Sequence, residues 1–150
     1  NFERLFFSHN LISEASAQQI RALLQLSTSL KEIRLNDNDQ IGDEAGLAIA
    51  EGLLRSPSIK VCHLSDTKIS GKSAAKLCEV IRSRSSTLKD LDISSNLIIM
   101  DDIEMLANAF KESHIECLNI RNNIVSAEEI VAFEHLLVPV STMTKRKFIF

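Results

Sequence analysis

The sequence predicts an α/β solenoid, a curved right-handed β-α superhelix with a parallel sheet on its concave face and helices on its convex face. Three observations lead to this fold class. One short apolar template recurs five times, the residues after each copy have an apolar spacing typical of a helix, and the copies start at nearly constant intervals, near residues 2, 30, 59, 88 and 115. A chain of 150 residues that is 45% hydrophobic can bury the core that such stacking needs.

Each template copy has the form apolar-x-x-apolar-x-apolar-x-x-Asn, which predicts a short strand that ends in a turn. The clearest copies begin at Leu30, Leu88 and Ile115, and weaker copies begin at Phe2 and Ile59. The last position forms a structural column of Asn10, Asn38, Thr67, Asn96 and Asn123. An Asn amide both donates and accepts hydrogen bonds within the turn, whereas a Thr hydroxyl offers less. We therefore expect the turn at Thr67 to be held least tightly.

An amphipathic helix is predicted after each of these turns. In every copy, an apolar residue just after the Asn or Thr position is followed by two more, 8 and 12 positions later, on one helical face. The residues are Ile12, Ile20, Leu24; Ile41, Ile49, Leu53; Ile69, Leu77, Ile81; Ile98, Leu106, Phe110; and Val125, Phe133, Leu137. One strand and one helix cannot bury these side chains alone, so neighbouring units must stack on one another.

The repeated unit resembles the leucine-rich repeat, and its length and helical second half are similar to the ribonuclease-inhibitor-like subfamily. The resemblance extends from about Phe2 to Leu137. Residues 38–46 resemble the subfamily's turn Asn-x-Ile-Gly-Asp-x-Gly with one residue inserted, which predicts a local bulge. A leucine-rich repeat domain over residues 1–137 is therefore expected.

The chain leaves the repeat pattern after Leu137, and Pro139 prevents the last helix from continuing. Residues 138–150 are expected to form a C-terminal cap or tail. The apolar segment 148–150 favours a cap, with an added strand as one form of it, over the start of a further element. The chain opens without Met on a template copy, so we expect it to be a piece of a longer chain. An open strand edge at residues 1–7 would also favour edge-to-edge self-association.

Binding residues are expected on the strand positions that the core does not use, because stacking aligns equivalent positions into columns on the concave face. The predicted partner-binding residues are Arg4, Phe6, Glu32, Arg34, His63, Asp90, Asp92, Asn119 and Arg121. Their charges are mixed and form no tract of one sign, which favours a protein partner over nucleic acid. The alternative for any single one of them is an ordinary solvated strand residue.

The composition argues against several other classes of protein. The chain has a net charge of −3, no Trp, no Tyr, three cysteines and no Asn-x-Ser/Thr triplet. Neither an aromatic platform for nucleic acid nor a disulfide-stapled secreted domain is supported by these counts. No uncharged apolar run of 18 residues is present to span a membrane. We expect a cytoplasmic protein, with cytoskeletal, ciliary or nuclear association left open.

Catalytic and cofactor sites receive little support from the sequence. Residues 66–73 lie between a strand and a helix and end in Gly-Lys-Ser, as in a phosphate-binding loop, but Asp66 stands where the first glycine is needed. Ser70 or Ser73 is better explained as a helix N-cap. No zinc-ligand spacing and no Cys-x-x-Cys occurs, so neither a metal nor a cofactor is expected. Cys117, on the predicted concave face, is a candidate reactive thiol without a positive charge nearby to activate it.

Two function classes remain, and the fold resemblance alone sets their order. The first is a non-enzymatic protein-protein interaction module or scaffold that binds a protein partner through the concave strand face. The resemblance to ribonuclease-inhibitor-like repeats implies relatives among inhibitors, innate-immune sensors, tropomodulins and scaffolds of cilia and cytoskeleton. The second is a regulatory accessory of a GTPase, like the GTPase-activating protein for Ran, or a regulator of actin filaments.

Overall fold

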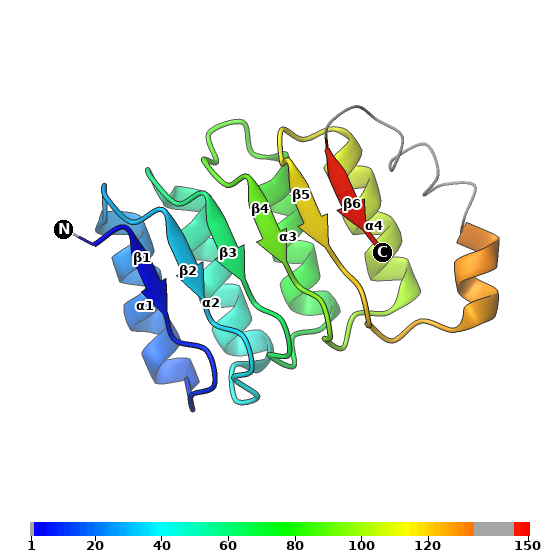
Figure 1. Ribbon diagram of the computed structural model, residues 1–150, viewed down its shortest axis with the longest axis horizontal. Coiled ribbons are helices and arrows are strands. Elements are labelled where there is room, and N and C mark those ends of the chain that lie inside the picture. Colours follow the sequence, from blue (N-terminus) through cyan, green and yellow to red (C-terminus); the bar gives the residue numbers. More distant parts are fainter. Residues whose placement is uncertain (1, 134–145) are drawn as a thin grey trace.

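The structure is a computed structural model that describes residues 2–133 and 146–150. Strands and helices alternate along the described chain, as the template predicts (Figure 1). The elements are β1 (Arg4–Phe6), α1 (Glu14–Leu26), β2 (Glu32–Arg34), α2 (Gly42–Arg55), β3 (Val61–His63), α3 (Gly71–Arg82), β4 (Asp90–Asp92), α4 (Met100–Lys111), β5 (Cys117–Asn119) and β6 (Lys147–Ile149). A further helix begins at residue 127 and is described as far as residue 133.

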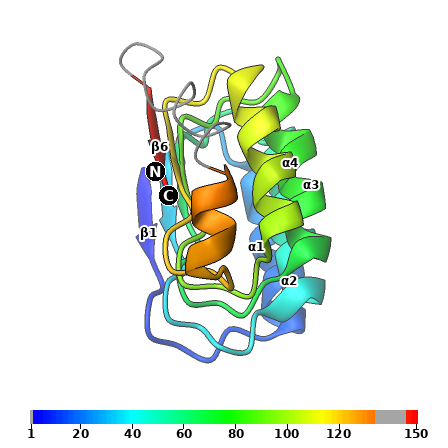
Figure 2. The ribbon, with the colours of Figure 1, turned by 90° about the vertical axis from the view of Figure 1, so that its right-hand side faces the viewer.

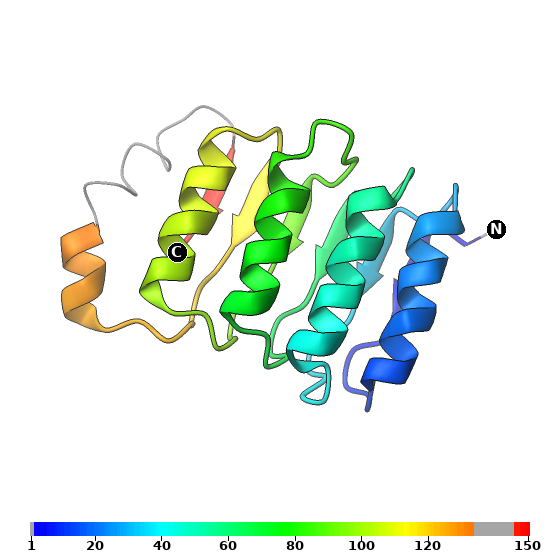
Figure 3. The same cartoon turned by 180° about the vertical axis from the view of Figure 1, so that it is seen from behind.

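All six strands form one parallel sheet in sequence order, β1-β2-β3-β4-β5-β6. The register is the same at every step, so that Leu5, Ile33 and Cys62, the middle residues of their strands, lie side by side. The sheet forms one layer and the helices form the other, as the side view in Figure 2 and the view of the helical face in Figure 3 show. Because packed helices need about 10 Å and strands about 4.8 Å, the sheet is the shorter, concave side. The predicted α/β solenoid is confirmed.

The core lies between the two layers and consists of the residues that the template marks as apolar. In the second repeat, Ile33 in β2, Leu35 directly after it, and the α2 residues Ile49 and Leu53 are fully buried. Gly46 lies where α2 meets α3, and a Cβ at this position would clash with the side chains of α3 and of the turn before it. The small residue therefore permits the close approach of two neighbouring helices.

The extra residue in the second turn forms the expected bulge. Asp39 and Gln40 make a turn in which the Ile41 N–H donates to the carbonyl oxygen of Asn38 at 3.1 Å. Gly42 follows with a positive φ of 55°, which a residue without a Cβ adopts at no steric cost, and α2 begins there. The insertion is thus absorbed before the helix and leaves the helical register intact.

The end of the chain adds a strand to the sheet. β6 pairs with β5 in the register of the earlier strands, and Phe148 lies against Phe110 with ring centroids 5.4 Å apart. The Arg146 guanidinium stacks 4.2 Å from the Phe110 centroid and donates to the carbonyl oxygen of Ile115 at 2.8 Å. β6 therefore takes the place of a sixth repeat strand. Residues 134–145, which hold most of the predicted cap or tail and its boundary, lie outside the described residues.

Candidate functional site

The strand residues on the concave side form two columns that cross the sheet. The third residues of β1 to β5 are Phe6, Arg34, His63, Asp92 and Asn119, and the first residues are Arg4, Glu32, Val61, Asp90 and Cys117. The structure therefore brings together eight of the nine predicted partner-binding residues on one face. The ninth, Arg121, is exposed in the turn after β5 and lies outside the strands.

At the β1–β2 end of this face, two arginines flank one carboxylate and an exposed aromatic ring. Arg34 donates from Nε to Glu32 Oε1 at 2.6 Å, and Arg4 Nε lies 3.4 Å from Glu32 Oε2. The Arg34 guanidinium is 5.2 Å from the centroid of the Phe6 ring, a cation–π contact, and Phe6 is still 59% exposed. This end carries a net positive charge together with the side-chain types that dominate binding energy at interfaces.

At the β3–β5 end, carboxylates prevail. His63 Nε2 lies 3.8 Å from Asp90 Oδ1. Asp92 accepts hydrogen bonds at Oδ1 from the Ser94 N–H at 2.9 Å and at Oδ2 from Asn119 Nδ2 at 2.9 Å. Asp92 therefore also fixes the turn after β4, a structural role that was not predicted from the sequence. The two ends of the concave face differ in the sign of their charge.

The three cysteines are free thiols whose surroundings keep them protonated at neutral pH. Burial raises the pKa of Cys62 to about 12 and that of Cys78 to about 11. Burial also raises the pKa of Cys117 to about 11, and the negative charge of Asp90 adds to the rise. The candidate role of Cys117 as a reactive thiol is therefore disfavoured. In the described part of the chain, no cluster of three or more His, Cys, Asp or Glu side chains could hold a metal ion, and no helix is long and apolar enough to cross a membrane.

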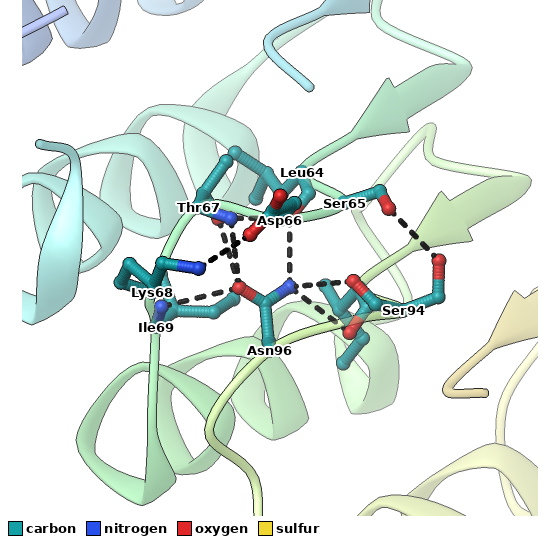
Figure 4. A network of polar contacts seen from close by, with 9 residues as sticks. Leu64, Ser65, Asp66, Thr67, Lys68, Ile69, Ser94 and Asn96 are labelled. Carbon is teal, nitrogen blue, oxygen red and sulfur yellow. Dashed lines mark hydrogen bonds and ion pairs between the residues drawn. The ribbon is translucent and has the colours of Figure 1, made fainter. Parts of the chain in front are cut away.

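Three amides of the Asn column join their turn to the turn of the repeat before it, and Figure 4 shows the junction at Asn96. Asn96 is buried, and its Oδ1 accepts hydrogen bonds from the backbone N–H groups of Thr67 at 3.0 Å and Ile69 at 3.2 Å. Its Nδ2 donates to the carbonyl oxygen of Leu64 at 2.8 Å. The same kind of bond to a preceding repeat is made by Asn38 and Asn123. These amides therefore have a structural role, because their hydrogen bonds connect neighbouring repeats.

Two members of the column behave differently. The Nδ2 of Asn10 donates to carbonyl oxygens of its own turn, those of Phe7 at 3.0 Å and Ser8 at 2.9 Å. Thr67 is fully buried, and its Oγ1 donates to the carbonyl oxygen of Leu64 at 2.8 Å. Towards the repeat before it, Thr67 offers its backbone oxygen, which accepts from the Gly42 N–H at 2.9 Å.

The start of α3 is capped by a side chain from the preceding repeat. Ser70 occupies the N-cap position, but its side chain makes no capping bond. The Asp43 carboxylate accepts instead from the N–H groups of Ser70 at 2.9 Å and Ser73 at 3.2 Å, and from Ser73 Oγ at 2.7 Å. Burial raises the pKa of Asp43, but these bonds outweigh it and hold the pKa below its ordinary value. Ser70 is the N-cap residue of α3, as one of the two predicted alternatives has it, but the carboxylate of Asp43, 30 residues before Ser73, accepts the capping bond from the Ser73 N–H in place of the Ser70 hydroxyl.

A further feature lies where the strands begin, outside the predicted site. Lys31, Lys60 and Lys89 precede β2, β3 and β4, and the N–H of each later lysine donates to the carbonyl oxygen of the earlier one at 2.8 Å. A depression of about 590 Å³ adjoins them, lined by Lys60, Val61, Lys89, Asp90, Glu116, Cys117 and Lys147. This depression was not predicted from the sequence, because the lysines precede the strand positions that align on the concave face. The signal was present, since one template position carries lysine in three successive repeats.

Comparison with known proteins agrees with this architecture. Residues 26–50 match the family model described as "Leucine Rich repeat". RAN GTPase-activating protein 2 of Arabidopsis thaliana is 28% identical over 122 residues, which cover 81% of this chain and 22% of that protein. The ribonuclease inhibitor of Sus scrofa is 26% identical over 97 residues, which cover 64% of this chain and 21% of that protein. The chain thus spans about a fifth of the length of the curated relatives it matches.

Solved structures share the fold. The tropomodulin C-terminal domain of Caenorhabditis elegans superimposes with a TM-score of 0.68 at 21% identity, covering 81% of this chain and 75% of that one. Leiomodin-1 actin-binding site 2 gives a TM-score of 0.63 at 18% identity, with 81% and 69% covered. The stacked strand–turn–helix units and the uncovered strand face define a solenoid repeat protein. The family match and the curated relatives support a leucine-rich repeat protein with repeats similar to those of the ribonuclease inhibitor.

Proposed function

We propose that this chain is a non-enzymatic, intracellular protein-interaction module that holds a protein partner against the concave face of its sheet. The observation that carries the proposal is the exposed Phe6 ring with the Arg34 guanidinium stacked on it. Aromatic and arginine side chains are enriched among the residues that dominate binding energy at protein interfaces. Helices cover the other face of the sheet, so a partner that binds a face of the sheet reaches the concave one.

The charge distribution on this face supports a partner with complementary charges. Arg4 and Arg34 outnumber Glu32 at one end, whereas Asp90 and Asp92 lie at the other. A partner that presents an acidic or aromatic group to β1 and β2 and a basic group to β4 satisfies both ends. Such complementarity fixes the orientation of a partner more than it raises the affinity.

Affinity capture from cell lysate with matched variants tests this proposal. The double variant Phe6→Ala/Arg34→Ala removes the exposed contact pair, and Gln18→Ala/Glu104→Ala changes two exposed residues of the helical face as a control. We expect the parent and the helical-face variant to retain the same protein, identified by mass spectrometry, and the concave variant to lose it. Circular dichroism checks that all three are folded. Equal retention by the concave variant would contradict the proposal.

The second candidate is a regulatory accessory of a GTPase, and the 28% identity to a protein named RAN GTPase-activating protein 2 over most of this chain favours it. This candidate predicts that the chain accelerates GTP hydrolysis by Ran in a single-turnover assay. The likeness in fold to tropomodulin and leiomodin-1 makes cosedimentation with actin filaments the matching test for a cytoskeletal regulator. A partner captured in the first experiment that is neither Ran nor actin would set this candidate aside.

A further inference from the structure

Charge is segregated between the two edges of the solenoid. We define the strand-end edge as the loops from strand to helix with the first four residues of each following helix. The strand-start edge comprises the last four residues of each helix with the loop to the next strand, and residues 2–3 and 146. In Figure 1 the strand arrows run from the strand-start edge to the strand-end edge.

The described residues of the two edges carry opposite net charges. The strand-end edge has ten acidic side chains against three basic ones: Glu14, Asp37, Asp39, Asp43, Glu44, Asp66, Asp101, Asp102, Glu128 and Glu129 against Lys68, Lys72 and Arg121. The strand-start edge has eight basic side chains against four acidic ones: Lys31, Arg55, Lys60, Arg82, Arg84, Lys89, Lys111 and Arg146 against Glu3, Glu79, Glu112 and Glu116. A net charge of −3 for the whole chain conceals this division.

Local structure accounts for most of the acidic edge. Acidic side chains are favoured at helix N-termini by the helix dipole, which covers the acids in the first turns of the helices. Asp37 and Asp66 have φ values of 57° and 51°, a left-handed conformation that Asp tolerates better than most residues. The same reasoning covers the bases in the last turns of α2, α3 and α4, and Arg146 packs on Phe110.

The lysines before the strands have no such explanation. Lys31, Lys60 and Lys89 lie outside the helices, at one repeat position, on adjacent rungs of the sheet. Lys31 Nζ donates to the Thr28 carbonyl oxygen at 3.4 Å, and Lys89 Nζ lies 3.4 Å from a Glu116 carboxylate oxygen. Within residues 2–133 and 146–150, no carboxylate lies within 4.0 Å of Lys60 Nζ. Three ammonium groups therefore line this edge with one ion pair among them.

We infer that the strand-start edge receives an acidic segment of the protein partner, whose carboxylates pair with Lys31, Lys60 and Lys89. The inference deepens the proposed function and rests on it, since the depression between Lys60, Lys89 and Lys147 opens on the concave face beside Val61. Successive lysines are about 4.8 Å apart at their backbones, and acidic residues at alternate positions of an extended segment are about 6.8 Å apart. Flexible lysine side chains bridge that difference.

An acidic polypeptide fits this edge better than a nucleic acid or an anionic membrane surface. Asp90 and Glu116 line the depression and would repel a phosphate backbone, which carries charge at every unit, whereas a peptide can leave neutral residues beside them. Stacking of unpaired bases needs aromatic side chains, and the exposed Phe residues of the described chain, Phe2, Phe6 and Phe7, lie at β1. Among the described residues, the large exposed apolar side chains of this edge are Phe2 and Leu26, which could anchor a membrane but lie in the first repeat, not in the repeats of Lys60 and Lys89.

Fluorescence anisotropy with a fluorescein-labelled dodecapeptide of alternating Glu and Ser tests the inference. We expect saturable binding that weakens with added NaCl, because the contacts are exposed ion pairs. The variant Lys60→Glu/Lys89→Glu should bind about tenfold more weakly. The control variant Lys68→Glu/Lys72→Glu makes the same charge change at the strand-end edge and should bind within about twofold of the parent.

Three results would overturn the inference: no saturable binding by the parent, an equal loss in the control variant, or tighter binding of a dodecauridylate or of phosphatidylserine vesicles than of the peptide. Thermal melts followed by circular dichroism confirm that each variant is folded.

Partner capture separates this inference from the proposed function. Loss of the partner by Phe6→Ala/Arg34→Ala alone leaves the concave-face proposal standing and contradicts the edge inference. Loss of the partner by Lys60→Glu/Lys89→Glu alone supports the edge inference and contradicts the concave-face proposal. Loss by both variants supports both proposals.

Discussion

The junction at Asn96 and the junction at Thr67 join neighbouring repeats in different ways. At Asn96, a side-chain amide enters the preceding turn and bonds two of its N–H groups and one carbonyl oxygen. At Thr67, the preceding turn contains the inserted residue and closes on itself through the bond from the Ile41 N–H to Asn38. Residue 67 is linked to that turn through its backbone oxygen, which accepts from the Gly42 N–H.

The difference shows that two irregularities of the sequence compensate one another. In the other turns, the N–H of the first apolar residue after the column donates to the Asn of the next repeat. In the turn with the inserted residue, the equivalent Ile41 N–H donates to Asn38 instead, and the next repeat is the one that carries Thr67. An Asn there would bury amide hydrogen-bonding capacity without partners, which is costly. The hydroxyl of Thr67 is satisfied by Leu64 within its own turn.

Replacing Asn96 by Ala is expected to have the largest effect. The substitution leaves the buried N–H groups of Thr67 and Ile69 without their acceptor. It also removes one of the two side-chain donors to the carbonyl oxygen of Leu64, the other being the Thr67 hydroxyl. We expect a loss of about 3 kcal/mol in the free energy of unfolding, measured by urea denaturation. A loss below about 1 kcal/mol would mean that water replaces the amide.

Replacing Thr67 by Ala is expected to cost less, about 1 kcal/mol, because one hydroxyl bond to Leu64 is lost and the backbone link to Gly42 remains. Thermal unfolding of the two Ala variants side by side measures the difference. Equal losses in melting temperature at Asn96 and Thr67 would remove the distinction between the two junctions.

A double-mutant cycle tests the compensation directly. Deleting Gln40 restores the regular turn length, and Thr67→Asn restores the amide. Each change alone should destabilise the chain. The deletion restores a turn with no amide to bind it, and the substitution buries an amide beside a turn that does not bind it. The two together should recover about 1 kcal/mol relative to the sum of the single effects. Additive effects in urea denaturation would show that the turn length and residue 67 are independent.

The Asp43 cap next to the Thr67 junction is expected to give the smallest effect and a pH dependence. Replacing Asp43 by Asn should cost about 0.5–1 kcal/mol at pH 7. Because the folded-state pKa lies below the ordinary value of 3.8, the carboxylate stabilises the fold fully above that pH, and this contribution is lost as the pH falls through the folded-state pKa. The stability difference between parent and variant should therefore shrink below about pH 4 in urea titrations. A constant difference from pH 7 to pH 3 would contradict this role.

The repeat, the order of strands and helices and the core were predictable from the sequence, because they follow from local spacing. Residues such as Ile33 and Ile49 are apolar at intervals that only a strand and then a helix can place on one side. The concave columns followed for the same reason, since identical units that stack in constant register align identical positions. The Asn positions were also visible, because an amide at the turn after a strand both donates and accepts hydrogen bonds to the backbone.

Contacts between repeats were decided only by the tertiary structure. The cap of α3 by Asp43, the reach of Asn96 into the preceding turn and the separation of charge onto two edges all join residues far apart in the sequence. A pattern within one repeat determines which groups need partners, but their partners depend on how neighbouring units stack. Spacing along the chain therefore determined the strand–turn–helix repeat, and the stacking of repeats determined the contacts between them and the charge of the two edges.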